Sequence, residues 1–583
     1  MNLLRKRFSR LSLAALLVAG LALPTGAQDG LLGVNDQLKL LGLLTNARVS
    51  PTGSYMAGQQ ALSDLRTDEA ARYLSAAAKA DWDNPLLVER AFIALAADGQ
   101  ISEAAATARR LLELETGNEL AQMISATEAL KERRYAAAEK QFAEISVETF
   151  SGVTAGILRA WALIGLNRKD EADALLQEIG ATGLDDFLIF HRALMAEAAG
   201  ETKLAIRLAG QAFENEPNVA RVAQVYASML ANAGHFEEAT DVIAQFEAAG
   251  LTHPLVTEVK RAVEAGRRPG IFTANVQVGA AEMYHGLGVA LARDGSPDIA
   301  LVFLRVGLYL DPKADVIAVA VGEVLDRVGQ AEAANRVYES IPANSPMKPA
   351  AVVRYAHNLD VLGDRDEAMR RLRNIVATRP DALDAVFTLA ELLRFDEQYD
   401  AAAEAYTKAL ELTGGRRNGD WAIYYTRGMS YERAGMWPQA EADLKKALEL
   451  NPGQPEVLNY LGYSWIDQDL NLEPALDMIE RAVEARPRDG YIIDSLGWAF
   501  YKLGRIDEAV KTLEQAVTLL PNDPELNDHL GDAYWKAGRR LEARFQWTIA
   551  ADVDEVGKVR ERVAPKLANG LVSDVAEQSA SDG

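Results

Sequence analysis

Apolar residues recur at helical spacing along most of the chain, in units of two short helices joined by a turn. The clearest unit runs from Gly490 to Pro521 and has its turn at Gly504. Its apolar and small positions follow the 3, 4, 7 spacing of one helix face: Ile493, Leu496, Gly497, Phe500, Ala509, Leu513 and Ala516. Because Gly497 and Ala509 are small, two helix axes can cross there at the usual ~8–10 Å. The pattern predicts a pair of packed helices.

This unit resembles the tetratricopeptide repeat (TPR), a helix pair with a period of 34 residues. The signature offsets of the repeat are occupied by Leu496, Gly497, Phe500, Gly504, Ala509, Leu513, Ala516 and Pro521. One pair cannot bury its apolar face alone, so neighbouring pairs must stack on it. Similar units start near residues 51, 85, 119, 153, 186 and 220, and again from about 281. We therefore expect an all-α fold, an α-solenoid superhelix of about fourteen TPR helix pairs.

The predicted repeats divide the chain into successive regions. Residues 28–50 are rich in leucine and are expected to form a lead-in that caps the first repeat, although a free segment that docks a partner fits the same pattern. Residues 51–250 form a degenerate N-terminal array and residues 281–552 a cleaner C-terminal array. Between them, the cluster Gly266 to Gly270 breaks the rhythm, so we expect 251–280 to be an irregular hinge or a change of superhelix direction. Residues 553–583 are expected to form a last helix and a disordered tail.

The first 27 residues have the features of a secretory signal. Four basic residues between Arg5 and Arg10 precede an apolar run from Leu11 to Leu23, and small residues follow up to Ala27. The run is short for a membrane-spanning helix, which needs about 20 apolar residues, so cleavage after Ala27 is favoured over an uncleaved anchor. We expect an exported, periplasmic protein with no membrane span in the mature chain. Since lipid attachment at a lipobox needs cysteine and the chain has none, it is not expected to be a lipoprotein.

Composition and motifs argue against catalysis and against nucleic acid. The chain carries 61 Lys and Arg against 84 Asp and Glu, a net charge of −23, which disfavours nucleic acid as a partner. Its six histidines form no H-E-x-x-H or other short metal spacing. Gly286-Leu287-Gly288 begins like a dinucleotide loop but lacks the third glycine and a preceding strand. We expect no enzyme activity, no cofactor, no metal and no small-molecule substrate.

The concave side of such an array is its usual ligand surface, and the first helix of each pair lines it. In the TPR family, positions 2, 5, 9 and 12 of each unit face that side. Carried over to the last four complete units, these offsets predict a peptide- or protein-binding groove of Tyr425, Met429, Asn459, Tyr463, Tyr491, Asp494, Trp498, Tyr501, Asp528 and Trp535. Aromatic rings supply rigid contact area, and an amide can bond a peptide backbone. The alternative is that these aromatics pack against neighbouring units.

The C-terminal third also resembles one subgroup of TPR proteins. The resemblance is carried by Leu458 to Trp465, Ala475 to Ile479, Asp494 to Trp498 and His529 to Asp532. These stretches are similar to bacterial envelope adaptors of carboxyl-terminal processing proteases, which hold the protease and present cell-wall hydrolases to it. The resemblance implies a non-enzymatic scaffold that binds such partner proteins in its groove. The alternative is a structural TPR subunit of an exopolysaccharide or pilus assembly machine.

Overall fold

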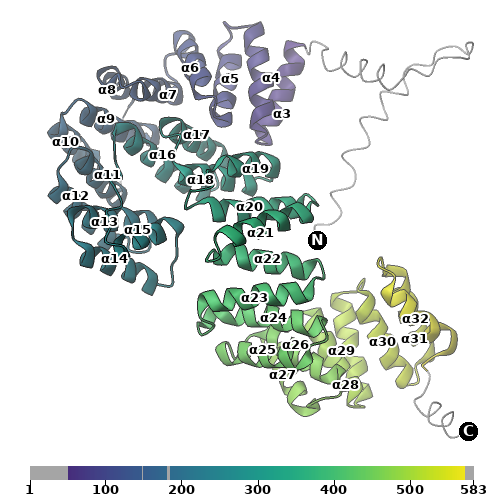
Figure 1. The fold of residues 1–583 in the computed structure, drawn as a ribbon. Coiled ribbons are helices and arrows are strands. Elements are labelled where there is room, and N and C mark those ends of the chain that lie inside the picture. The colour runs from purple at the N-terminus through teal and green to yellow at the C-terminus, as the bar shows by residue number, and fades with distance from the viewer. Residues whose placement is uncertain (1–49, 147–148, 180–183, 572–583) are drawn as a thin grey trace, which may run out of the picture.

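The computed structural model describes residues 50–146, 149–179 and 184–571 (Figure 1). Thirty α-helices and no strand occur among these residues, and 78% of the described residues are helical, so the predicted all-α solenoid is confirmed. The predicted signal segment 1–27, nearly all of the lead-in 28–50 and the tail beyond residue 571 lie outside the described residues.

The first array consists of six helix pairs followed by one unpaired helix, and it begins close to the predicted repeat starts. The bounds are α3 (Pro51–Ser63), α4 (Thr67–Ala80), α5 (Pro85–Asp98), α6 (Ile101–Leu114), α7 (Glu119–Lys131), α8 (Tyr135–Ala143), α9 (Phe150–Gly165), α10 (Lys169–Ile179), α11 (Asp185–Ala198), α12 (Thr202–Asn215), α13 (Ala220–Ala233), α14 (Phe236–Ala248) and α15 (Pro254–Glu264).

Eight further pairs and a terminal helix complete the described chain. The first four pairs are α16 (Val276–Arg293), α17 (Pro297–Leu310), α18 (Asp315–Arg327), α19 (Ala331–Ser340), α20 (Lys348–Val361), α21 (Arg365–Thr378), α22 (Leu383–Phe395) and α23 (Tyr399–Thr413). After a 3-10 turn, η2 (Asn418–Asp420), come α24 (Trp421–Arg433), α25 (Trp437–Leu450), α26 (Pro455–Asp467), α27 (Leu472–Ala485), α28 (Gly490–Lys502), α29 (Ile506–Leu519), α30 (Pro524–Lys536), α31 (Arg540–Val553) and α32 (Lys558–Asn569). Six pairs and eight pairs give the expected fourteen.

The pair α28–α29 shows why these sequences form helix pairs. Asp489 caps α28 by accepting hydrogen bonds from the backbone N–H groups of Tyr491 and Ile492. A Cβ on Gly497 would lie only 2.6 Å from Leu513 Cγ of α29, so the glycine is what lets the two axes approach. Gly504 makes the turn with a φ of 74°, a conformation that glycine adopts without strain.

The break between the arrays is shorter than the sequence predicts. The lone helix expected after Pro254 is present as α15, and an irregular loop with positive φ at Gly266 and Gly270 follows it. Helix α16, however, already begins at Val276, so residues 276–280, predicted to be irregular, are helical. The reason is a cap, because Asn275 Oδ1 accepts a hydrogen bond from Val278 N at 3.1 Å.

After the break the chain turns back onto the first array. Helix α16 packs against α9 and α11, and α17 packs against α5 (Figure 1). These partners are first helices of their pairs, which line the concave side of such an array. We call the concave face formed by α5, α7, α9 and α11 the first groove. Hydrogen bonds join Thr127 Oγ1 to Tyr284 OH at 2.7 Å and Gln277 Nε2 to the Leu130 carbonyl at 2.9 Å. The first groove is therefore filled by α16 and α17.

The hydrophobic core reflects this return. One continuous cluster of buried side chains runs from Ala61 to Ala351 and includes both the first array and α16–α19. A separate cluster begins at Val352, and another at Leu444. The first cluster extends past residues 251–280 because α16 and α17 bury their apolar faces in the first groove, and half-buried Tyr355 of α20 packs against both this cluster and the next.

Candidate functional site

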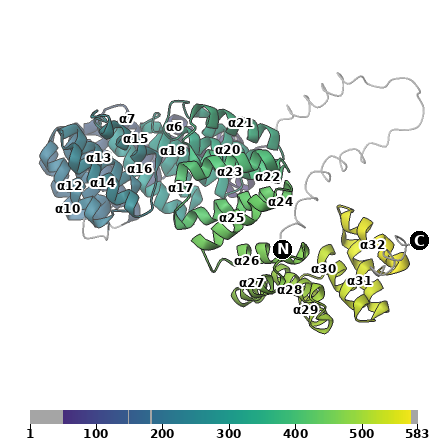
Figure 2. The ribbon, with the colours of Figure 1, turned by 60° about the horizontal axis from the view of Figure 1, so that its bottom comes forward.

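The first helices of the last four pairs form a concave surface, which we call the inner face: α24, α26, α28 and α30. Helix α26 contacts α28, and α28 contacts α30, whereas the second helices of these pairs lie farther apart. All ten residues of the predicted groove are on these four helices. In Figure 2, α26 to α32 curl away from the body of the molecule, and α24, α26 and α28 make no extensive contact with described helices beyond their neighbours.

Side chains from successive helices converge around Tyr463 of α26. The phenol is half-buried, and burial is the main cause of its raised pKa. The carboxylates of Asp467, Asp494 and Glu525 raise this pKa further, and Arg562 of α32 opposes them. Charges on α28, α30 and α32, the first helices of the next pairs and the terminal helix, thus act electrostatically on one phenol of α26.

Trp498 lies within an aromatic cluster at the centre of the inner face. Its indole ring stacks with Tyr501 at 4.7 Å and with His529 at 4.2 Å between ring centroids. His529 Nδ1 is 2.9 Å from Asp494 Oδ2. Burial alone would lower the pKa of His529, but the adjacent carboxylate of Asp494 more than offsets this, so the pKa is raised. The sequence predicts that Asp494 contacts a partner. This prediction is wrong, because the Asp494 side chain is buried and is hydrogen-bonded to His529.

Helix α32 covers the C-terminal end of the predicted groove. Lys566 Nζ donates to Asp528 Oδ1 at 2.6 Å and to both carboxylate oxygens of Asp532 at 2.8 Å. Arg562 Nε donates to Asp528 Oδ2 at 2.7 Å, so the Asp528 side chain is only 1% exposed. Gly570 sits directly against the ring of Trp535, where any Cβ would overlap it. The sequence predicts that Asp528 and Trp535 line an open groove. This prediction is wrong, because α32 occupies that position.

The remaining predicted residues differ in how much they offer a partner. Tyr491 is 58% exposed. Tyr425 and Met429 are half-buried, and burial together with Glu456 raises the pKa of Tyr425 to about 12. Asn459 is half-buried, with its Oδ1 enclosed and without a hydrogen-bond partner among the described residues. The accessible part of the inner face is thus an aromatic strip from α24 to α28.

Sequence reasoning missed several members of this site. His529 stacks on Trp498, and Tyr460 OH donates to Glu432 Oε2 at 2.9 Å. The role of α32 had a readable signal, because Arg562 and Lys566 have the same four-residue spacing as Asp528 and Asp532, and residues spaced in this way share one helix face.

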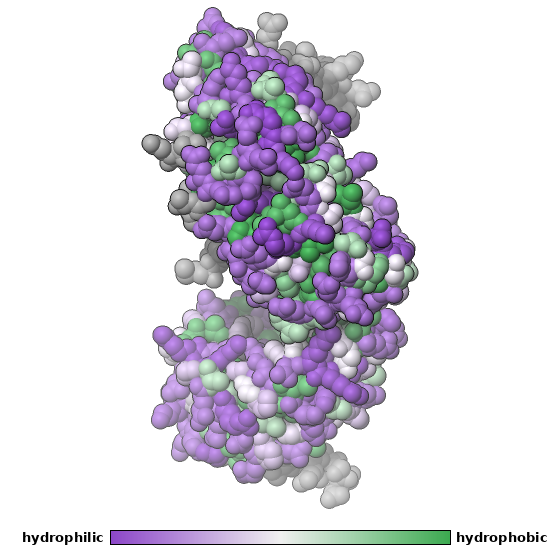
Figure 3. Space-filling model, turned by 90° about the vertical axis from the view of Figure 1, so that its left-hand side faces the viewer, coloured by the Kyte–Doolittle hydropathy of each residue, from purple (hydrophilic) through white to green (hydrophobic). Residues whose placement is uncertain are grey.

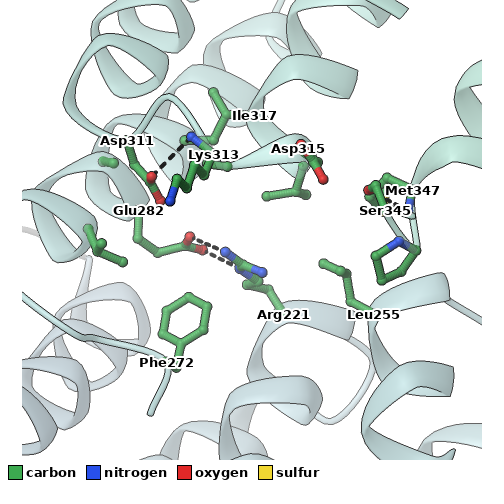
Figure 4. A pocket seen from close by; sticks show the side chains of 15 residues that line it. Arg221, Leu255, Phe272, Glu282, Asp311, Lys313, Asp315, Ile317, Ser345 and Met347 are labelled. Carbon is green, nitrogen blue, oxygen red and sulfur yellow. Dashed lines mark hydrogen bonds and ion pairs between the residues drawn. The ribbon is translucent and has the colours of Figure 1, made fainter. Parts of the chain in front are cut away.

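A second concave feature lies at the junction of the arrays. A cavity of about 210 Å³ is bounded by α13, α15, α16 and the turns before α18 and α20 (Figure 4). Arg221 donates two hydrogen bonds to Glu282, at 2.8 and 2.7 Å, and lies 4.5 Å from the Phe272 ring centre. Burial would raise the pKa of Glu282, but Arg221 and His285 outweigh it and hold the pKa below its usual value. This buried ion pair joins α13 to α16.

The described residues hold no group of three or more His, Asp or Glu placed to bind a metal ion. Within the same residues, no helix combines the length and apolarity needed to cross a bilayer. The face shown in Figure 3 is mainly hydrophilic, with small apolar areas between charged ones.

Parts of the chain are similar in sequence to known repeat families and proteins. Models of the tetratricopeptide repeat match residues 353–417 and 421–454, and a TPR repeat model matches 497–538. A TPR repeat-containing protein of Pseudomonas aeruginosa is 31% identical over 148 residues, which are 25% of this chain and 24% of that protein. The human protein O-mannosyl-transferase TMTC1 is 23% identical over 168 residues, 29% of this chain and 19% of its own. The chain thus covers about a quarter or less of either relative.

Two solved structures show a partial likeness to this chain. A tetratricopeptide repeat protein from Parabacteroides merdae is 15% identical, with a TM-score of 0.38, and the match covers 44% of this chain and 99% of that one. Yeast Tom70 is 14% identical, with a TM-score of 0.32 and coverage of 77% and 98%. The chain therefore contains tetratricopeptide repeats at 353–417, 421–454 and 497–538, and such repeats indicate a scaffold for protein–protein interaction.

Proposed function

We propose that the chain is an exported, non-enzymatic scaffold of the bacterial envelope that holds a partner polypeptide against its inner face. The observation that carries this proposal is the strip of partly exposed aromatic rings on α24 to α28, which includes Tyr425, Tyr463 and Tyr491. Aromatic rings such as Tyr425 and Tyr491 provide apolar area with few rotatable bonds, which is favourable for contact with a polypeptide. The export signal expected at residues 1–27 supports the envelope location.

Charge favours a basic partner segment. The groups that act on Tyr463 are mainly carboxylates, and the whole chain carries a net charge of −23. Helix α32 is an example within the chain, since it docks on α30 through Arg562 and Lys566. A partner segment with Lys or Arg beside apolar residues matches the same chemistry, because complementary charge steers association and fixes register.

The bound partner would then be presented to a periplasmic processing protease. The resemblance of residues 281–550 to protease adaptors supports this step. In its test, purified chain is added to a carboxyl-terminal processing protease and a cell-wall hydrolase, and the rate of hydrolase cleavage is measured. We expect faster cleavage with the intact chain than with a Tyr463→Ala variant. Equal rates with and without the chain would contradict the presentation step.

The inner face itself is tested by site-specific photocrosslinking in envelope extracts. A photoreactive residue replaces Met429 or Tyr491 on the inner face, or Phe545, which is 65% exposed on α31. We expect a discrete crosslinked protein from the first two positions only, and its loss when Tyr463→Ala is added. The proposal fails if Phe545 yields the same product, or if Tyr463→Ala leaves the crosslink unchanged.

A further inference from the structure

Helix α16 approaches the first groove closely because two of its positions that face the first array are glycines. A Cβ on Gly279 would overlap the ring of Trp161 on α9, and a Cβ on Gly286 would lie 2.6 Å from the ring of Phe187 on α11. Residues seven apart lie on the same side of a helix. The two glycines therefore form the surface through which α16 meets the aromatic rings of the first array.

His191 of α11 lies at this contact. Its side chain is fully buried, and neither ring nitrogen has a hydrogen-bond partner among the described residues. Three aromatic rings surround it, with centroids 4.5 Å away for Phe187, 5.8 Å for Phe190 and 6.3 Å for Trp161. An imidazole in such a setting is neutral, because a charged group without polar partners is costly to bury.

The charged group that acts on His191 is Glu282 of α16. Arg221 of α13 and His285 of α16 contact this carboxylate. Glu282 already accepts two hydrogen bonds from Arg221, and His285 Nδ1 lies 3.4 Å from the same carboxylate. Burial lowers the pKa of His191 to about 4, and the attraction of Glu282 offsets only part of this. No carboxylate on α9, α11 or α13 is placed to compensate a proton on His191 among the described residues.

We propose that the docking of α16 in the first groove is an acid-sensitive latch, in which a proton on His191 loosens the contact between the two arrays. The inference does not depend on the proposed function of the inner face. In the closed state His191 is enclosed by rings. When α16 separates from α9 and α11, the imidazole reaches water and takes up a proton at its ordinary pKa of about 6.5.

The direction of the pH effect follows from proton linkage. The open state binds more protons than the closed state between the ordinary pKa of about 6.5 and the lowered value in the closed state, so acid favours opening. With a closed-state pKa of about 4, lowering the pH from about 7.5 to about 4.5 raises the opening constant on the order of fifty-fold. The hinge for such an opening is the loop that contains Gly266 and Gly270.

The test measures backbone hydrogen exchange of the full chain at both pH values, after correction for the intrinsic exchange rate. We expect peptides from α16 to lose protection on the order of fifty-fold in acid, while peptides from α28 serve as an internal reference. In His191→Phe the ring is retained but cannot titrate, so the acid-induced loss in α16 is expected to disappear. His357→Phe on α20, where the histidine is exposed, is the matched control and should behave like the parent.

The outcomes separate the latch from general acid unfolding. Equal loss of protection in α16 and α28, or the same loss in His191→Phe as in the parent, would overturn the proposal. If His191→Phe does not fold, His191→Met provides an apolar, non-titrating side chain of flexible shape. Small-angle scattering supplies a second measurement, since opening of the latch should increase the radius of gyration in acid for the parent but not for the histidine variant.

Discussion

The first groove and the inner face of the last array are built from similar helix pairs, but the surroundings and the pKa of the buried histidine differ between them. In the first groove, which α16 and α17 fill, His191 is enclosed by rings and its pKa is lowered. On the inner face, which lies open from α24 to α28, His529 is held by Asp494 and its pKa is raised. The rings around His191 leave it without a hydrogen-bond partner among the described residues, whereas the carboxylate of Asp494 provides one for His529.

The two surfaces differ because of the helix that docks on each of them. Helix α16 has small residues where it meets the first groove. Gly279 and Gly286 let α16 lie against Trp161 and Phe187. Beside the inner face, α32 carries Arg562 and Lys566 instead and binds only the end formed by α30. Two modes of docking thus occur in one molecule, an apolar mode along the first groove and an ionic mode at the end of the last array.

The largest expected loss of stability comes from a substitution that blocks the apolar docking of α16 in the first groove. Gly279→Leu places a branched side chain where the Trp161 ring lies, and we expect the first unfolding transition in denaturant to lose about 3 kcal/mol. Gly117→Leu is the control, because nothing lies within 4 Å of a Cβ at Gly117. If both variants unfold at the same denaturant concentration, α16 does not dock where the structure places it.

A smaller loss is expected within the last array. Ala509 is fully buried at the crossing of α28 and α29, so Ala509→Leu should cost about 2 kcal/mol by overpacking. The exposed Gln515 on α29 provides the control Gln515→Leu. Hydrogen exchange should place the destabilisation of Ala509→Leu in α28 and α29 and leave the first array unchanged. Destabilisation spread over both arrays would show that their cores are not separate.

The third prediction concerns pH. Because the folded pKa of His529 is raised, its pairing with Asp494 contributes stability that is complete below the unfolded pKa of about 6.5. This contribution is lost as the pH rises through the folded pKa. Asp494→Asn should therefore cost about 1–2 kcal/mol in mild acid and less in mild alkali, measured by thermal unfolding. His191 has the opposite sign, since its contribution is lost as the pH falls from about 6.5 towards 4. A larger cost of Asp494→Asn in alkali would contradict the assigned ion pair.

The smallest effect on stability is expected at the exposed rim of the inner face. Tyr491 is 58% exposed, so Tyr491→Ala should change the free energy of unfolding by less than about 0.5 kcal/mol. The same variant is expected to weaken photocrosslinking from Met429. Unchanged crosslinking would place the partner elsewhere on the molecule.

The sequence was sufficient for the features that depend on neighbouring residues. Gly497 and Ala509 at the helix crossing and Gly504 at the turn are read within one repeat, because a helix pair is a local structure. The ten predicted groove residues also lie on the expected helices for the same reason. Whether each of these residues is accessible depends on the segment that packs beside the next repeat. The local periodicity of the sequence contains no information about that segment.

Docking of distant segments is the part that sequence reasoning did not predict. Gly286 comes directly before the Leu287-Gly288 pair, and the repeat pattern predicts no contact for it, but it faces Phe187 of the first array. The seven-residue spacing of Gly279 and Gly286 was a usable signal of close helix approach. Likewise, Asp528 and Trp535 were assigned to an open groove, although the basic residues of the last helix complement Asp528 and Asp532.

The filling of the first groove by a later segment also has a consequence for the order in which the chain acquires its structure. Tyr284 contacts Thr127, which lies 157 positions earlier in the chain, so this part of the molecule depends on non-local contacts, which form slowly. During synthesis at about 5–20 residues per second, Trp161 precedes Gly279 by an interval on the order of ten seconds. Nascent chains that fold in this order expose Trp161 and Phe187 until α16 arrives, which makes that interval the natural point for a chaperone to bind and for self-association to begin.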